Sequence, residues 1–137
     1  MSRRALSACT LVVAVLAMAA CGGGGSKPYT AKGTAACLRT KAFKDVTTNP
    51  VQVGFIASFA ENGGIRATSA TGNVVTIAFA ADEDATASTR QAFRRHAPPA
   101  YRRHLNDVMR SQGNAVLVWT VTPDPGQLAD AESCLHP

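Results

Sequence analysis

The side chains with the clearest chemical potential are arginines and histidines that repeat in the C-terminal half of the chain. Phe93-Arg94-Arg95-His96 is followed eight residues later by Tyr101-Arg102-Arg103-His104. Positions 90 to 110 hold six arginines, two histidines and one acid, Asp107. Because guanidinium groups form paired hydrogen bonds with phosphates and carboxylates, the arginines are a candidate anion-binding patch. The patch comprises Arg90, Arg94, Arg95, Arg102, Arg103 and Arg110.

Other catalytic or metal-binding patterns are weak. His104 and Asp107 are three residues apart, but a third ligand would have to come from His96 on a different helix, and the sequence has no His-Glu-x-x-His pattern. It also has no Gly-x-Ser-x-Gly and no phosphate-binding glycine loop. We therefore predict no catalytic residue, no metal and no cofactor. An envelope enzyme or an enzyme accessory remains the alternative, and it requires a cleft where His96 or His104 meets a carboxylate.

The N-terminus has the layout of a secretory signal peptide. Ser2-Arg3-Arg4 precedes an apolar run from Ala5 to Ala20 that is interrupted only by Ser7 and Thr10. As a helix this run would span about 24 Å, which is short of the hydrocarbon core of about 30 Å. The sequence therefore predicts a cleaved leader rather than a permanent membrane span.

The leader ends in Met18-Ala19-Ala20-Cys21, followed by four glycines and Ser26. This ending resembles the lipobox of bacterial lipoproteins, in which a Leu-like residue and two small residues precede a cysteine that receives a diacylglyceryl thioether. Met18 stands where Leu is commonest. The resemblance implies cleavage before Cys21, lipidation of its sulfur, palmitate or a similar acyl chain on the new amine, and a place on the outer face of the cytoplasmic membrane. An ordinary cleavage site at Ala17-Met18-Ala19 is the alternative.

The leader divides the chain into three parts: a lipoprotein signal peptide at 1–20, a lipidated Gly-rich tether at 21–29 and an extracytoplasmic domain at 30–137. The domain is also similar to small lipoprotein domains of high-GC Gram-positive bacteria, a similarity that implies no particular activity. The residues that carry it are Ala36-Cys37-Leu38, Gly113 to Trp119 and Ser133-Cys134-Leu135.

The cysteines of the mature chain can be paired. Cys9 leaves with the leader, and lipid on Cys21 leaves Cys37 and Cys134. An exported domain folds in an oxidising compartment, so we expect these two to form a disulfide. Two buried free cysteines or a reactive pair are the alternatives.

The charge of the mature chain limits its partners. The full chain carries +5, and loss of Arg3 and Arg4 leaves twelve basic residues against nine acids, or +3. This excess is too small to predict nucleic-acid binding. Anionic lipid, a phosphate-bearing wall polymer or an acidic protein are candidate ligands of the arginine patch. The plainer interpretation, which we favour, is two solvated helix faces around a turn.

The periodicity of apolar residues predicts an α+β domain with one small, mainly antiparallel sheet, helices packed against it, and terminal helices joined by the disulfide. The expected strands are 43–47, 65–70, 74–81 and 115–121, the last of them central. The expected helices are 34–41 with Thr34 as N-cap, 51–61, 82–97, 99–112 capped by Gly113, and 125–135 with Asp124 as N-cap. We expect Phe55 and Phe59 to be buried, and a three-residue loop to pair Ile65 with Phe79. Together with the lack of catalytic patterns, these observations lead us to expect a non-enzymatic binding module.

Overall fold

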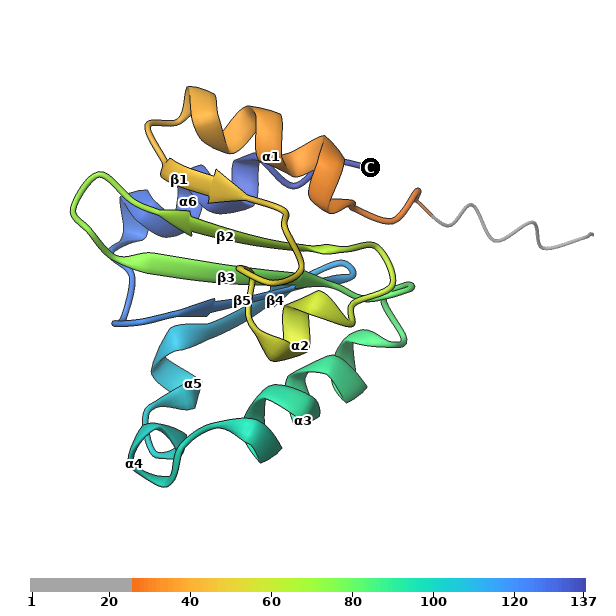
Figure 1. Cartoon of the computed structure of the whole chain (residues 1–137), viewed down its shortest axis with the longest axis vertical. Helices are drawn as coiled ribbons and strands as arrows, with labels where there is room; N and C mark the ends of the chain where they lie inside the picture. The colour runs from red at the N-terminus through yellow and green to blue at the C-terminus, as the bar shows by residue number, and fades with distance from the viewer. Residues whose placement is uncertain (1–25) are drawn as a thin grey trace, which may run out of the picture.

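Five strands form one antiparallel sheet in the order β1-β2-β3-β5-β4, as Figure 1 shows. The computed structural model describes residues 26–137. Its strands are β1 (Lys44–Thr47), β2 (Gly64–Thr68), β3 (Val74–Phe79), β4 (Met109–Gln112) and β5 (Ala115–Trp119). Its helices are α1 (Ala31–Thr40), α2 (Phe55–Ser58), α3 (Thr86–His96), α4 (Pro99–Arg102), α5 (Leu105–Val108) and α6 (Pro125–Ser133). The predicted α+β class with a single sheet is confirmed.

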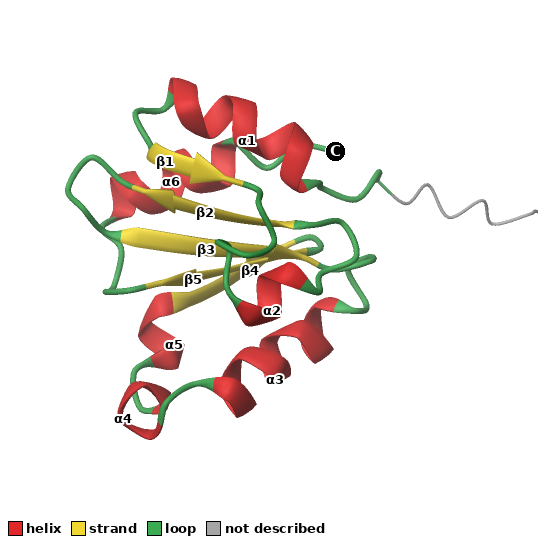
Figure 2. Cartoon of the chain, viewed as in Figure 1, coloured by secondary structure: helices red, strands yellow, loops and turns green. Residues whose placement is uncertain are grey.

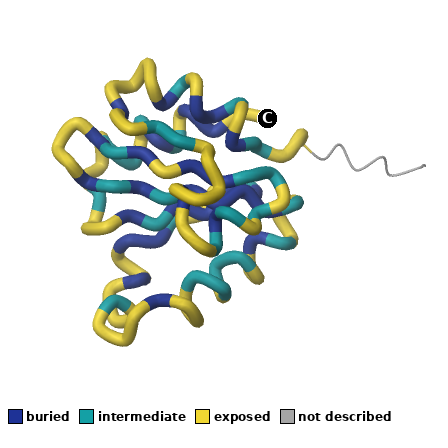
Figure 3. The backbone as a smooth tube through the Cα atoms, in the orientation of Figure 1, coloured by how far each residue is buried: buried dark blue, intermediate teal, exposed yellow. Residues whose placement is uncertain are grey.

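Helices cover both faces of the sheet (Figure 2). One face is covered by α1 and α6, and the other by α2, α3 and α5. Ile65, Ile77 and Leu117 lie opposite one another on the first face, and none of the three is exposed to solvent. Figure 3 shows that the buried residues concentrate along β3 and β5. The larger core therefore lies between the sheet and the α1–α6 layer.

The strand that is apolar on both faces is central, as predicted. β5 pairs with β3 on one side and with β4 on the other. The prediction of a helix up to Gly113 is wrong, because Met109–Gln112 forms the edge strand β4. Leu105, Val108 and Met109 are nevertheless buried. The apolar spacing identified the inward side chains correctly, while pairing with β5 decided the backbone conformation.

The β2–β3 hairpin has the expected faces but a different register. Ile65 pairs with Ile77 rather than with Phe79, a shift of two residues. A shift of two keeps the same side chains on each face. The loop is longer than expected because the Ser69 N–H donates to Asn73 O at 2.8 Å and Gly72, with φ +88°, donates to Ser69 O.

Helix boundaries follow the caps. The N-cap of α1 is Thr30, whose side chain accepts from the Gly33 N–H, and not Thr34, which is buried inside the helix. α3 begins at Thr86 rather than at Asp82, because Asp82 accepts from the Ala85 N–H in the preceding turn. α6 begins as predicted, with Asp124 in a capping box with Gln127. The expected helix over 51–61 is reduced to the single turn of α2.

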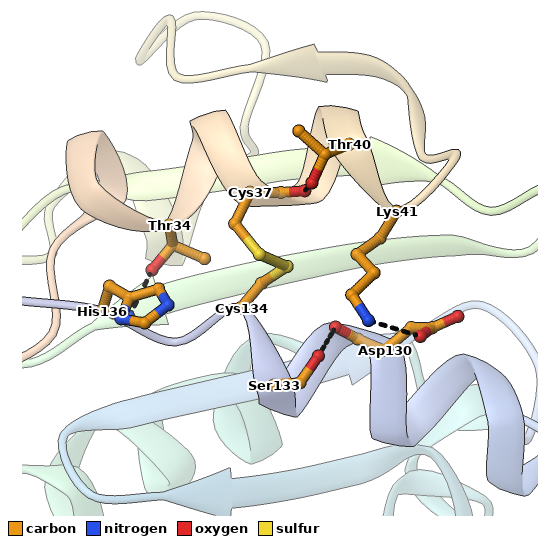
Figure 4. The surroundings of a disulfide bond; sticks show 8 residues. All are labelled: Thr34, Cys37, Thr40, Lys41, Asp130, Ser133, Cys134 and His136. Atoms are coloured by element: carbon orange, nitrogen blue, oxygen red, sulfur yellow. Dashed lines mark hydrogen bonds and ion pairs between the residues drawn. A yellow bond between two sulfur atoms is a disulfide. The ribbon is translucent and has the colours of Figure 1, made fainter.

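The predicted disulfide joins Cys37 of α1 to Cys134 at the end of α6, with Cα atoms 5.3 Å apart (Figure 4). The Thr30 N–H donates to His136 O at 2.9 Å, and Lys41 pairs with Asp130 at 3.4 Å. The sheet, both helical layers and this bond all lie within residues 29–137. This part of the chain therefore contains a complete core of its own.

The predicted leader and Cys21 lie outside the described residues. Within residues 26–137, no helix has the length and apolar character needed to cross a membrane.

Candidate functional site

Two of the six arginines of the patch serve as helix caps. Arg102 donates from Nε to the Ala97 carbonyl at 2.9 Å, at the end of α3. Arg110 donates from Nη1 to the carbonyls of Asn106 and Met109, both at 2.9 Å, where α5 passes into β4. The last carbonyls of a helix lack partners within it, so these guanidiniums complete the local backbone hydrogen bonding.

The other four arginines lie on or at the ends of α3 and α4 and form no ion pairs with carboxylates of the described residues. Arg90 is half-buried on α3, while Arg94, Arg95 and Arg103 are exposed. Arg94 donates to the Asn106 side chain at 3.3 Å. Within residues 26–137 the salt bridges are Lys41–Asp130 and His104–Asp107, so no arginine of the patch is paired with a carboxylate. Arg94 and Arg102 border an open hollow of about 480 Å³.

A narrow apolar groove lies beside these residues, between α2 and the segment from α3 to α5. Its floor is formed by Thr76 of β3 and Val118 of β5, and its volume is about 250 Å³. The walls are mostly apolar and include Val53, Ile56, Phe93, Tyr101 and Leu105. Sites for small molecules usually enclose about 300 to 1,000 Å³, so this groove is better suited to one apolar side chain or a short stretch of acyl chain.

Val51, Phe55 and Phe59 are exposed apolar residues, and Phe55, which lines the groove, forms an apolar ridge with Phe59. The three residues are 91%, 63% and 75% exposed, and no charged residue occurs between Asp45 and Glu61. The prediction that both phenylalanines are buried is wrong. Gly54, at φ +90°, is the N-cap of the single turn of α2. Val53, which precedes this turn, and Ala57 within it pack against the sheet, so that both phenylalanine rings point outward.

Basic side chains lie directly beside the ridge. The rings of Phe55 and Phe59 are 5.1 Å apart between centroids, and the rings of Phe55 and His96 are 5.3 Å apart. A second hollow, of about 490 Å³, lies between α2 and α3, and Arg95 and His96 line it together with both phenylalanines. The structure thus brings the basic end of α3 next to an exposed aromatic pair.

The histidines do not form an acid–base constellation. His104 Nδ1 lies 3.9 Å from Asp107 Oδ2, beyond hydrogen-bonding distance, and both side chains are exposed. His96 contacts the Phe55 ring instead of a carboxylate. Residues 26–137 contain no cluster of three or more potential metal ligands among His, Cys, Asp and Glu.

Tyr101 is an ionisable residue that is partly buried between α4 and β5. Its hydroxyl contacts the main-chain carbonyl oxygens of Trp119 and Thr120, and burial raises the pKa of the phenol above its ordinary value. The hydroxyl holds α4 against the end of β5. Its role is therefore structural, because its donor is already used.

Sequence patterns did not reveal the ridge. Val53, Ile56, Ala57 and Ala60 have helical spacing, and that spacing predicted a longer buried helix. Gly54 could have indicated the difference, because a glycine inside such a segment favours a helix that begins after it rather than before it. Comparisons of the chain with protein-family models, with curated proteins and with solved structures found no significant match.

Proposed function

We propose that this chain is an envelope lipoprotein, anchored through Cys21 to the outer face of the cytoplasmic membrane, and that its domain is a non-enzymatic binding module. The observation that supports the binding role is the uncovered surface where the apolar ridge meets unpaired arginines. Isolated exposed apolar residues are common, but a contiguous aromatic pair beside a groove is typical of an interaction site.

The disulfide supports the anchoring half of the proposal. Cys37 and Cys134 are bonded to each other, so Cys21 is the remaining cysteine of a chain cleaved before that residue. A bond of this kind persists in oxidising compartments outside the cytoplasm. An enzyme has less support, because within residues 26–137 no histidine lies within hydrogen-bonding distance of a carboxylate.

The anchor is tested by replacing Cys21 with Ser in the full chain and separating membrane from soluble fractions. We expect the wild-type protein to stay in the membrane fraction after a carbonate wash and to take up labelled palmitate, and Cys21→Ser to lose both properties. Cys9→Ser is the matched control, because Cys9 lies in the leader and its loss should leave both properties intact. Retention of Cys21→Ser after the wash would show that the leader spans the bilayer uncut.

A further inference from the structure

Basic residues lie near the apolar ridge on two elements, α3 and β2. On α3, Arg95 and His96 line the hollow that the ridge phenylalanines share. On β2, exposed Arg66 pairs with Thr76, which forms part of the floor of the groove. Opposite residues in an antiparallel pair lie on the same face with Cβ atoms about 5 Å apart. Arg66 therefore belongs to the same face as the ridge.

We infer that this face docks onto an anionic lipid bilayer, with Phe55 and Phe59 inserted at the boundary between headgroups and acyl chains and Arg66, Arg94 and Arg95 at the phosphates. Protein segments that lie on membranes combine an apolar face, buried about 5–10 Å deep, with cations at its border. Both halves of that pattern are present here, and the arginines are not neutralised by carboxylates of the described chain.

Two of the three alternatives match only one half of the surface. A phosphate-bearing polymer has anions for the arginines but leaves Phe55 and Phe59 in water. A second copy of the chain covers the ridge but brings arginines against arginines, which is unfavourable. An acidic protein can match both halves, but it has to compete with a surface that the anchor holds close by.

The anchor limits the distance between the domain and the bilayer, an argument that rests on the proposed lipidation of Cys21. Ser26, the first described residue, is five residues from Cys21, and five residues span at most about 17 Å when fully extended. The domain thus stays within about its own width of the headgroups.

The charges along α3 favour one orientation. Asp82, Glu83 and Asp84 precede the helix and line a hollow with Ser26, where the chain enters the domain, whereas Arg94, Arg95 and His96 occupy its last turn. The helix of eleven residues separates the two groups by about 16 Å. An anionic surface repels the acidic end of α3 and attracts its basic end. The domain should therefore orient with the ridge toward the bilayer. Figure 1 shows α2 and α3 on the same side of the sheet.

The test measures partition of the unlipidated domain, residues 26–137, into vesicles of phosphatidylcholine alone or mixed with phosphatidylglycerol. We expect binding to the mixed vesicles that weakens as salt rises. Arg94→Ser/Arg95→Ser should weaken it by about thirty-fold. Phe55→Ser/Phe59→Ser should weaken it by at least about ten-fold. Lys32→Ser/Arg39→Ser on α1 is a control that removes the same number of charges, and Val121→Ser beyond β5 is a control that removes an exposed apolar side chain outside the ridge; both should bind like the wild type.

A second measurement reports insertion itself. In the variant Phe59→Trp, brominated acyl chains should quench the new indole, while buried Trp119 in the parent domain should remain unquenched. Absence of binding to mixed vesicles at low salt overturns the proposal, and so does binding that depends on the arginines but not on the phenylalanines. Arginine-dependent binding to polyglutamate without binding to vesicles would assign the face to an acidic protein, and ridge-dependent dimers in sedimentation would assign it to a second copy. Because the assay uses a domain without Cys21, its failure is distinct from failure of the lipid anchor.

Discussion

The guanidinium of Arg102 holds the C-terminal end of α3 by donating to the carbonyls of Ala97 at 2.9 Å and Arg95 at 3.3 Å. It comes from the next helix, α4, so the bonds fix the corner between the two elements. The side chain of the neighbouring Arg103 makes no hydrogen bond or ion pair to residues 26–137. Adjacent arginines of one sequence repeat thus have different roles.

Replacement of Arg102 by Met should separate these roles. Met keeps an apolar stem but removes the donors, so we expect the free energy of unfolding to fall by about 1 kcal/mol. Arg103→Met, the matched control, should change it by less than about 0.5 kcal/mol. Urea unfolding measures both. Equal effects from the two substitutions would contradict the capping role of Arg102.

The repeat shows how far sequence reasoning reached. The sequence predicted a basic cluster around a turn from the repeat of Phe93 to His96 in Tyr101 to His104. The structure has that turn at Ala97 and Pro98. Which guanidiniums close helix ends depends on carbonyl positions that are fixed only after the chain has turned. The basic cluster was therefore predictable as a region, while its division between arginines that cap helices and arginines without a carboxylate partner was not.

The same limit applies to the ridge and to β4. Hydrophobic spacing gives the set of inward side chains, and Val53, Ala57, Leu105 and Val108 are buried as that spacing requires. Spacing does not say whether the backbone continues as a helix. At Met109 the unpaired edge of β5 supplied backbone partners, and those tertiary hydrogen bonds outweighed local helix preference.

Removal of the disulfide should cost much of the domain's stability. The bond closes a loop across 97 residues of sequence. Chain-entropy estimates for such loops give nearly 5 kcal/mol, so we expect Cys37→Ala/Cys134→Ala to lose about 3–5 kcal/mol in urea unfolding. Reductant should lower the urea midpoint of the wild type to about that of the double variant and leave the midpoint of the double variant unchanged. A wild-type midpoint insensitive to reductant would contradict this expectation.

Asn114 should be the most sensitive polar position outside the disulfide. Its side chain is buried, accepts from the Tyr29 N–H at 2.7 Å, and donates to the carbonyls of Tyr29 at 3.0 Å and Ala80 at 2.7 Å. Asn114→Ala leaves these groups short of partners and should destabilise the domain by about 2–3 kcal/mol. Hydrogen exchange should accelerate at the Tyr29 amide. The exposed Gln112→Ala is the control, and faster exchange in both variants would argue against a specific clamp.

Tyr101 gives the domain a dependence on alkaline pH. Burial raises the pKa of the phenol in the folded state, whereas the unfolded chain titrates near the ordinary value of about 10. Between these two values the folded state holds more protons than the unfolded state, so its stability falls as pH rises above about 10. At pH 8 the wild type should exceed Tyr101→Phe in stability by about 1 kcal/mol, because the variant loses the hydrogen bond to the end of β5. This difference should shrink above about pH 10, since only the wild type must then keep a titrating phenol protonated. Urea unfolding of both proteins at paired pH values isolates the effect, because every other titrating group is common to them. A difference that stays constant or widens with pH would show that the phenol is not held in its protonated form.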